Sequence, residues 1–322
     1  RIAAMATDPA PAAPAAARVR GAWEAPASAL AYLLTSLAMS LMTKWAASSW
    51  RFPGSSLLLL IECAATVAAL ALAAPRGRPY RPLDAGILRH LPVVTIAKAL
   101  NMYLSFLAMR RTSLPVYNVL KRLQPVYALV QDWAIRGAVA NSLELASLSA
   151  ICLGTLATGA GDPDLDLVGY GVALLAAGCQ SLCLVLARSA QDSLPGLTST
   201  DLLFYTAFYN CFLFLPLSLG EATEIQAFLA APGEPLRFLY FVLPYILLGA
   251  LLNFTTFWCT AANSPLATAV AGNAKGAVST LAGVLAFGTW LTPVGWLGLA
   301  GNTMGGLVFS LAQAKKPKKK SA

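Results

Sequence analysis

The chain alternates between long apolar segments and short polar breaks. Each apolar segment holds about twenty residues, the length that a helix needs to cross a hydrocarbon core of about 30 Å. Breaks such as Arg51-Phe52-Pro53-Gly54 and Pro232-Gly233-Glu234-Pro235 are rich in turn-forming residues, and the connections are short. The pattern predicts an all-α membrane protein, one compact bundle of ten transmembrane helices at residues 29–48, 55–74, 87–108, 115–135, 140–160, 167–187, 200–219, 237–260, 265–287 and 293–313.

The composition agrees with a membrane protein and excludes other classes. Of 322 residues, 57% are hydrophobic and 11% are charged, and the mean hydropathy is +0.65, unlike soluble domains or disordered chains. The net charge of +9 would suggest nucleic acid in a soluble protein, but here the charges are too few to build a basic binding face. We therefore expect a lipid bilayer around the chain and no nucleic-acid partner.

Cysteine and histidine usage argues against metal sites and hydrolytic catalysis. The six cysteines all fall inside apolar windows, without the polar loops of a disulfide framework. His90 is the single histidine, so the sequence cannot supply a zinc site built on several histidines and offers one candidate imidazole, in an Arg-rich loop, for a Ser-His-Asp triad. The sequence implies no metal, no cofactor and no hydrolytic enzyme.

The two ends of the chain predict its orientation. Residues 1–28 are rich in Ala and Pro and predict a flexible cytosolic tail, and residues 314–322 predict a basic cytosolic tail. In the basic tail, Lys319 and Lys320 fit a dilysine retrieval signal that binds coat protein; a positive-inside anchor is the alternative, and both place the C-terminus in the cytosol. An even number of helices puts the N-terminus there too. Fourteen Lys/Arg in cytosolic segments, against four on the opposite side, support this orientation.

Five cations fall within or at the ends of the apolar windows: Lys44, Lys98, Lys121, Arg122 and Lys275. A cation near the bilayer centre is costly unless it faces water or an anion, so these residues indicate a substrate pathway. For Lys44 and Lys98, snorkelling of the side chain to a nearby interface explains the position equally well.

A thin internal repeat sharpens this interpretation. Sliding the chain by 151 residues superposes two halves, about 29–160 and 167–313, although shared composition could produce the same match. Each half would hold five helices, an odd number, so the halves would insert with opposite orientation. Lys121 and Lys275 would then lie at similar depth on opposite walls of a central cavity. Cations that converge at the midplane favour a doubly charged anion as substrate.

Aromatic and small residues offer further candidate contacts. Phe204-Tyr205 and Phe208-Tyr209-Asn210 repeat at a spacing of four residues, so two aromatic side chains would stack on one helical face with an amide at its end. Such a platform could hold a nucleobase, and a lipid-facing aromatic patch is the alternative. The small residues around Gly272 would let a ligand or a neighbouring helix approach the backbone closely.

Several segments resemble one known family. They are Ser113-Leu114-Pro115-Val116-Tyr117-Asn118-Val119-Leu120-Lys121-Arg122, with a Leu-Pro pair before a Lys/Arg doublet; Asn253-Phe254-Thr255-Thr256 with residues 263–275; and Thr43-Lys44, where many members have Asn-Lys. In these segments the chain resembles the nucleotide-sugar transporters of solute carrier family thirty-five, especially the D subfamily, within the drug/metabolite transporter superfamily. The resemblance covers roughly residues 30–313.

The resemblance implies a fold, a location and an activity. The fold is ten helices in two inverted five-helix repeats with cytosolic termini, in the Golgi or endoplasmic reticulum membrane. The activity is exchange of a cytosolic nucleotide sugar for a lumenal nucleoside monophosphate by alternating access. GDP-mannose transporters carry Phe-Tyr-Asn-Asn and Gly-Ala-Leu-Asn-Lys, where this chain has Phe208-Tyr209-Asn210-Cys211 and Gly272-Asn273-Ala274-Lys275. These departures favour a UDP-sugar, with a GDP-sugar as the alternative.

The resulting hypothesis assigns roles to the candidate residues. Lys121, Arg122 and Lys275 would neutralise the diphosphate, while Tyr209 and Asn210 would hold the base. The remaining candidates for substrate binding are Tyr117 and Asn273, expected to contact sugar or ribose, together with Gly272 and Lys44. Three alternatives stay open: a triose-phosphate-type exchanger, a polytopic membrane transferase, and a transport-inactive scaffold or receptor. The oligomeric state, a homodimer included, is also left open.

Overall fold

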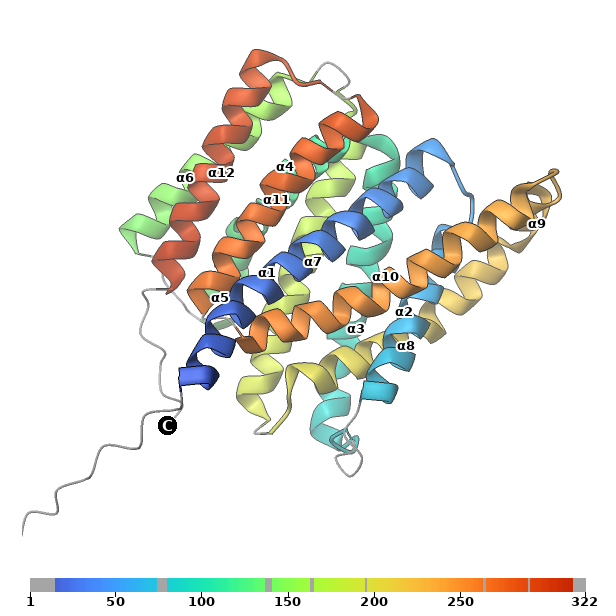
Figure 1. Cartoon of the computed structure of the whole chain (residues 1–322), viewed down its shortest axis with the longest axis horizontal. Coiled ribbons are helices and arrows are strands. Elements are labelled where there is room, and N and C mark those ends of the chain that lie inside the picture. Colours follow the sequence, from blue (N-terminus) through green and yellow to red (C-terminus); the bar gives the residue numbers. More distant parts are fainter. Residues whose placement is uncertain are drawn as a thin grey trace, which may run out of the picture.

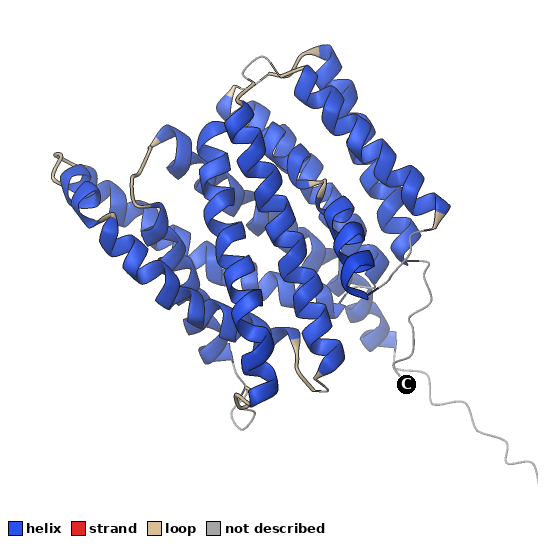
Figure 2. Cartoon of the chain, turned by 180° about the vertical axis from the view of Figure 1, so that it is seen from behind, coloured by secondary structure: helices blue, strands red, loops and turns tan. Residues whose placement is uncertain are grey.

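The computed structural model describes residues 15–73, 80–136, 141–162, 165–194, 196–262, 265–288 and 290–314. Every regular element in these ranges is a helix (Figure 2). In chain order, as labelled in Figure 1, they are α1 (Ala15–Lys44), α2 (Ser55–Ala73), α3 (Ala85–Arg111), α4 (Leu114–Lys121), α5 (Gln124–Arg136), α6 (Ser142–Ala160), α7 (Leu167–Ser193), α8 (Ser199–Gly220), α9 (Ala222–Leu229), α10 (Glu234–Ala262), α11 (Pro265–Phe287) and α12 (Pro293–Ala314). A π-helical turn, Trp45–Ser49, continues α1.

The helices have the length and composition of a multi-pass membrane protein. Helices occupy all ten apolar windows predicted from the sequence. Within the described ranges, seven segments are long and apolar enough to cross a membrane: Pro26–Ser49, Ser55–Leu72, Ala85–Arg111, Ser142–Ala160, Leu167–Ser193, Ser199–Gly220 and Glu234–Leu252. Ten membrane crossings in two inverted repeats stay a prediction.

The first helix begins earlier than hydropathy predicted. α1 starts at Ala15, so residues 15–28 are helical, although the sequence pattern favoured a flexible tail up to residue 28. The physical reason is that the first turns of α1 are rich in Ala and Arg, which have high helix propensity. Hydropathy indicates where a helix becomes apolar, and this need not be where the helix begins. Residues 1–14 lie outside the described residues.

The fourth apolar window is a broken helix. It forms α4 and α5, with Arg122 and Leu123 between them. Pro125 has no backbone N–H and cannot donate to the Lys121 carbonyl, so the helix of α4 cannot continue in register. Hydropathy does not register the break because the residues on both sides are apolar. In membrane proteins such interruptions are tolerated where they lie inside protein or line a cavity.

The helices pack in pairs that join distant parts of the chain. α6 packs along α12, α3 along α7, α2 along α8, α1 along α10, and α4 against α11 (Figure 1). Glycines bring α6 and α12 especially close. A Cβ atom added to Gly298 would lie only 2.4 Å from the backbone nitrogen of Thr158, and one added to Gly154 only 2.4 Å from that of Asn302. These two helices therefore approach backbone to backbone.

Polar contacts hold the loop between α1 and α2. The Glu221 carboxylate, at the end of α8, accepts hydrogen bonds from the Ser56 backbone N–H and hydroxyl, both at 2.9 Å. The indole of Trp50 donates to Glu234 at 2.7 Å. These contacts tie the facing ends of α1 and α2 to α8 and α10, and so fix two of the helices that form the cavity described next.

Candidate functional site

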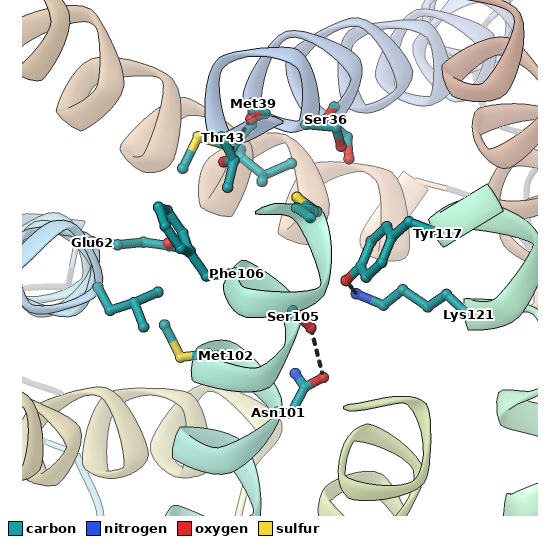
Figure 3. A pocket seen from close by; sticks show the side chains of 14 residues that line it. Ser36, Met39, Thr43, Glu62, Asn101, Met102, Ser105, Phe106, Tyr117 and Lys121 are labelled. Atoms are coloured by element: carbon teal, nitrogen blue, oxygen red, sulfur yellow. Dashed lines mark hydrogen bonds between the residues drawn. The ribbon is translucent and has the colours of Figure 1, made fainter. Parts of the chain in front are cut away.

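A cavity of about 230 Å³ lies between α1, α2, α3, α4 and α10. Its lining combines apolar side chains with hydroxyl, amide, carboxylate and ammonium groups: Ser36, Met39, Ser40, Thr43, Leu59, Glu62, Asn101, Met102, Ser105, Phe106, Met109, Tyr117, Lys121 and Leu252. Figure 3 shows Glu62 on one side of this space and Tyr117 and Lys121 on the other. Eight of these fourteen side chains carry a polar group, so the cavity is suited to a polar small molecule.

Tyr117 and Lys121 form one edge of the cavity. They are four residues apart on α4, so they share one face of the helix. The Lys121 ammonium donates to the Tyr117 hydroxyl at 3.2 Å and lies 5.4 Å from the centroid of the same ring, within cation–π range. Among the described residues, Lys121 has no carboxylate in ion-pair contact. Its positive charge is therefore available to an anionic ligand in the cavity.

Glu62 faces the same cavity from α2, and sequence analysis missed it. Its Oε2 accepts a hydrogen bond from the buried hydroxyl of Tyr245 at 3.1 Å. Lys98 and Lys121 are the cations near enough to interact with its charge. The signal was present in the sequence, because Glu62 is the sole carboxylate in the window at 55–74. Intramembrane carboxylates indicate function by the same reasoning as intramembrane cations.

Hydroxyl and amide groups from α1 and α3 complete the polar lining. Ser36, Ser40 and Thr43 lie along one face of α1, and the Ser40 and Thr43 hydroxyls donate to carbonyls one turn earlier, each at 2.8 Å. On α3, the Ser105 hydroxyl donates to the Asn101 side-chain oxygen at 3.3 Å (Figure 3). Helical hydroxyls often bond to their own backbone, so spacing alone does not distinguish these residues from ordinary ones.

Arg122 points away from the cavity. Its guanidinium donates to the side-chain oxygens of Asn302 at 3.2 Å and Thr303 at 2.5 Å on α12. It also covers α11, where a Cβ atom added to Gly276 would lie 2.8 Å from Nη2. Adjacent residues at a helix end point in different directions, so the Lys/Arg doublet is divided between the cavity and the contact with α11 and α12.

Lys44 and Lys98 connect helices. The Lys44 side chain is 6% exposed, and its ammonium donates to the carbonyls of Met109 and Thr112, each at 2.6 Å, at the C-terminus of α3. It therefore satisfies carbonyls that have no partner within their own helix. Lys98, on α3, donates to the Thr206 hydroxyl of α8 at 3.0 Å. Neither lysine lines the cavity.

The candidate base platform lies on α8, outside the cavity lining. Tyr209 packs at the edge of the apolar cluster that includes Ile87 and Tyr205. Asn210 is fully buried, and neither of its amide atoms has a hydrogen-bond partner among the residues that the structure describes. Phe204 stacks on Tyr80 with ring centroids 4.0 Å apart. The structure thus brings together Tyr117 and Lys121, and it separates them from Tyr209 and Asn210.

For five candidate residues the structure does not describe where they lie relative to the cavity. Gly272, Asn273 and Lys275 lie on α11, but the surroundings of Gly272 and the side chains of Asn273 and Lys275 are not described. Lys319 and Lys320, proposed as a retrieval signal, lie beyond residue 314 and are also outside them.

Comparison with known proteins relates most of the helical region to transporters. The sequence profile of the Triose-phosphate Transporter family matches residues 28–310. The UDP-galactose/UDP-glucose transporter 7 of Arabidopsis thaliana is 30% identical, with 92% of each chain covered. The nucleotide sugar transporter SLC35D2 of Homo sapiens is 26% identical, with 95% of this chain and 92% of that protein covered.

A solved crystal structure has a similar fold. Its TM-score is 0.52, its sequence is 18% identical, and the match covers 91% of this chain and 97% of that one. The arrangement of helices described above is therefore one that an experimentally determined protein adopts along nearly its whole length.

Proposed function

Since this chain belongs to the Triose-phosphate Transporter family, we propose that it transports nucleotide sugars across a membrane, with UDP-sugars favoured. Relatives named as a UDP-galactose/UDP-glucose transporter and a nucleotide sugar transporter, each matched along most of its length, support this choice. A nucleoside monophosphate would be the exchanged ligand, because it presents a doubly charged phosphate to the same cations.

One observation carries the proposal: the Lys121 ammonium faces the cavity without a carboxylate partner among the described residues. A positive charge inside a membrane-spanning bundle is costly unless a ligand or water compensates for it. The Tyr117 hydroxyl, 3.2 Å away, orients the ammonium and could also donate to a phosphate oxygen. Together the two groups offer a phosphate one charge and one directed hydrogen bond.

Lys275 is the proposed second cation. It lies on α11 one turn before Ser279, whose hydroxyl accepts a hydrogen bond from Asn118 on α4 at 3.1 Å. The helix that carries Lys275 is therefore packed against the helix that carries Lys121. Two cations from α4 and α11 would match the charge of a diphosphate or of a nucleoside monophosphate.

Alternating access would use two inverted halves. In an inverted repeat, the helices of the first half (α1, α2, α3, α4–α5 and α6) would correspond in order to those of the second half (α7, α8, α10, α11 and α12). Under this correspondence α3 maps onto α10 and α7 onto α1, so the α3–α7 pair is equivalent to the α10–α1 pair. The same correspondence returns the α2–α8, α4–α11 and α6–α12 pairs to themselves. All of these pairings are present. This symmetry supports an inverted repeat that rocks around a site between its halves.

The proposed location is the Golgi or endoplasmic reticulum membrane with both termini in the cytosol. The distribution of Lys and Arg between the loops supports the orientation. Binding of coat protein to the tail belongs to the same proposal and rests on the sequence alone.

Exchange of a phosphorylated sugar for phosphate is a second candidate function. The observation that favours it is the absence of Tyr209 and Asn210 from the cavity lining. The polar groups around the space of about 230 Å³ are then hydroxyls, Asn101, Glu62 and Lys121. Such a space suits a sugar phosphate, whereas a nucleotide sugar would have to extend along the bundle or widen the cavity.

Uptake by proteoliposomes discriminates between these substrates. Vesicles containing the purified chain are loaded with UMP, GMP or inorganic phosphate and offered labelled UDP-glucose, GDP-mannose or glucose 6-phosphate. We expect UDP-glucose uptake that depends on internal UMP. Uptake of glucose 6-phosphate against internal phosphate, without uptake of either nucleotide sugar, would establish the second candidate instead.

A further inference from the structure

The cavity has an acidic side chain on one side and a basic side chain on the other. Among its described lining residues, Glu62 is the single acidic side chain and Lys121 the single basic one. They come from different helices, α2 and α4, and reach the space from opposite sides (Figure 3). A ligand held by its phosphates at Lys121 would therefore direct its other end toward a carboxylate.

The Glu62 carboxylate is held in place but not neutralised by an ion pair. The Tyr245 hydroxyl donates to Oε2 at 3.1 Å, and Tyr245 is anchored in the core. Within the described part of the chain, Oε1 accepts no hydrogen bond and no Lys or Arg is in ion-pair contact with Glu62. The nearby Lys98 instead donates to Thr206. One carboxylate oxygen thus remains available to a donor in the cavity.

The chemistry of a carboxylate selects what can bind beside it. An ionised carboxylate accepts hydrogen bonds and donates none, so it binds hydroxyl groups well. It disfavours a second carboxylate or phosphate, because like charges side by side in a desolvated site repel strongly. Ser36 and Thr43 line the same cavity and add hydroxyls that can bond to a polyol.

From this arrangement we infer that Glu62 determines the class of sugar that is transported. The substrate is a nucleoside diphosphate linked to a neutral, hydroxylated sugar, and nucleoside diphosphate hexuronates are rejected. The inference rests on the proposed function, since it places phosphates at Lys121. Glu62 acts on specificity, through charge. The Tyr245 hydroxyl is a hydrogen-bond partner of this carboxylate and leaves its charge unchanged.

The test compares two substrates that differ at one carbon. UDP-glucose carries a hydroxymethyl group at C6, and UDP-glucuronate carries a carboxylate there. Their kcat/KM values for uptake are measured with wild type, Glu62→Gln, Tyr245→Phe and Glu224→Gln. Gln keeps the size and an acceptor for Tyr245 but removes the charge. Glu224, exposed on α9, provides the same substitution away from the cavity.

We expect wild type and Glu224→Gln to prefer UDP-glucose by roughly tenfold or more, the scale of a like-charge contact. Tyr245→Phe keeps the charge and should keep the preference. Glu62→Gln should bring the two kcat/KM values to within about threefold of each other, because no full charge then opposes the carboxylate.

The outcomes separate the inference from the function on which it rests. Wild type that takes up both substrates equally well, or Glu62→Gln with the wild-type preference, overturns the inference while nucleotide-sugar transport stands. If Glu62→Gln does not fold, the wild-type preference decides: a preference for UDP-glucose supports the inference, and equal uptake of both substrates overturns it. Wild type that takes up neither nucleotide sugar refutes the proposed function, and the inference with it.

Discussion

Replacing Lys44 with Met tests whether this lysine supports the fold or binds substrate. Lys44 was a candidate substrate ligand on sequence grounds, but its ammonium donates to the carbonyls of Met109 and Thr112 at the end of α3. Met is similar in length and apolar, so Lys44→Met removes the two hydrogen bonds with little change in packing. The structure therefore predicts a loss of stability and an unchanged affinity for substrate.

The size of the loss follows from the two hydrogen bonds. Each has a charged donor and a length of 2.6 Å, and such bonds contribute about 1.5–3 kcal/mol each. The stabilisation from these two hydrogen bonds is partly offset because the buried ammonium has lost its hydration. We expect the free energy of unfolding to fall by about 2 kcal/mol, since two backbone carbonyls are left without their donor.

Two measurements on the same preparation check this prediction. Thermal unfolding in detergent should show a lower midpoint for Lys44→Met, and uptake of labelled UDP-glucose below that midpoint should show the wild-type KM. Lys121→Met is the matched comparison and should show the reverse pattern, with a near wild-type midpoint and impaired uptake. The reasoning is refuted if Lys44→Met unfolds like wild type and has a raised KM.

Three further variants test packing, burial and helix capping. Gly298→Ala should lower the free energy of unfolding by about 1–3 kcal/mol, because its Cβ would press on the Thr158 backbone; Gly301→Ala, with open space around it, should not lower the thermal midpoint. Asn210→Leu removes a buried amide without hydrogen-bond partners among the described residues and should leave the midpoint equal or higher, whereas loss of UDP-glucose uptake would assign Asn210 to the base. Asp166 caps α7, and hydrogen bonds from the Gly169 and Val168 backbones hold its pKa below the usual value. Its stabilisation is therefore present above the unfolded-state pKa and lost as pH falls through the folded-state pKa. Asp166→Asn keeps a capping side chain and should flatten the acid side of the midpoint-versus-pH curve; an unchanged acid limb argues against the cap.

The family and the positions of the helices could be predicted from the sequence. The resemblance to nucleotide-sugar transporters of the drug/metabolite transporter superfamily is confirmed by the family match and by the relatives. Ten apolar windows coincide with helices because a bilayer demands long apolar stretches, and hydropathy measures these directly. Hydropathy did not reveal the break at Pro125, since that feature is set by one missing N–H group within an apolar stretch.

The candidate site was harder to predict, because residue type does not fix direction. Lys121 and Arg122 are adjacent and both cationic, yet one lines the cavity and the other bonds to α12. Lys44 lies where the family pattern has a lysine, but its ammonium is occupied by the end of α3. Glu62 was not among the predicted site residues, although the cost of burying charge applies to both signs.

Nucleotide-sugar transport through the Lys121 cavity is tested most directly by uptake of labelled UDP-glucose into UMP-loaded proteoliposomes. The variants are Lys121→Met and, as a matched control on an exposed part of α3, Arg89→Ala. We predict exchange by wild type and Arg89→Ala, and a kcat/KM lower by roughly thirtyfold or more for Lys121→Met, because a desolvated ion pair with phosphate is lost. Uptake by Lys121→Met at the wild-type rate, or no UMP-dependent uptake by wild type, would contradict the account.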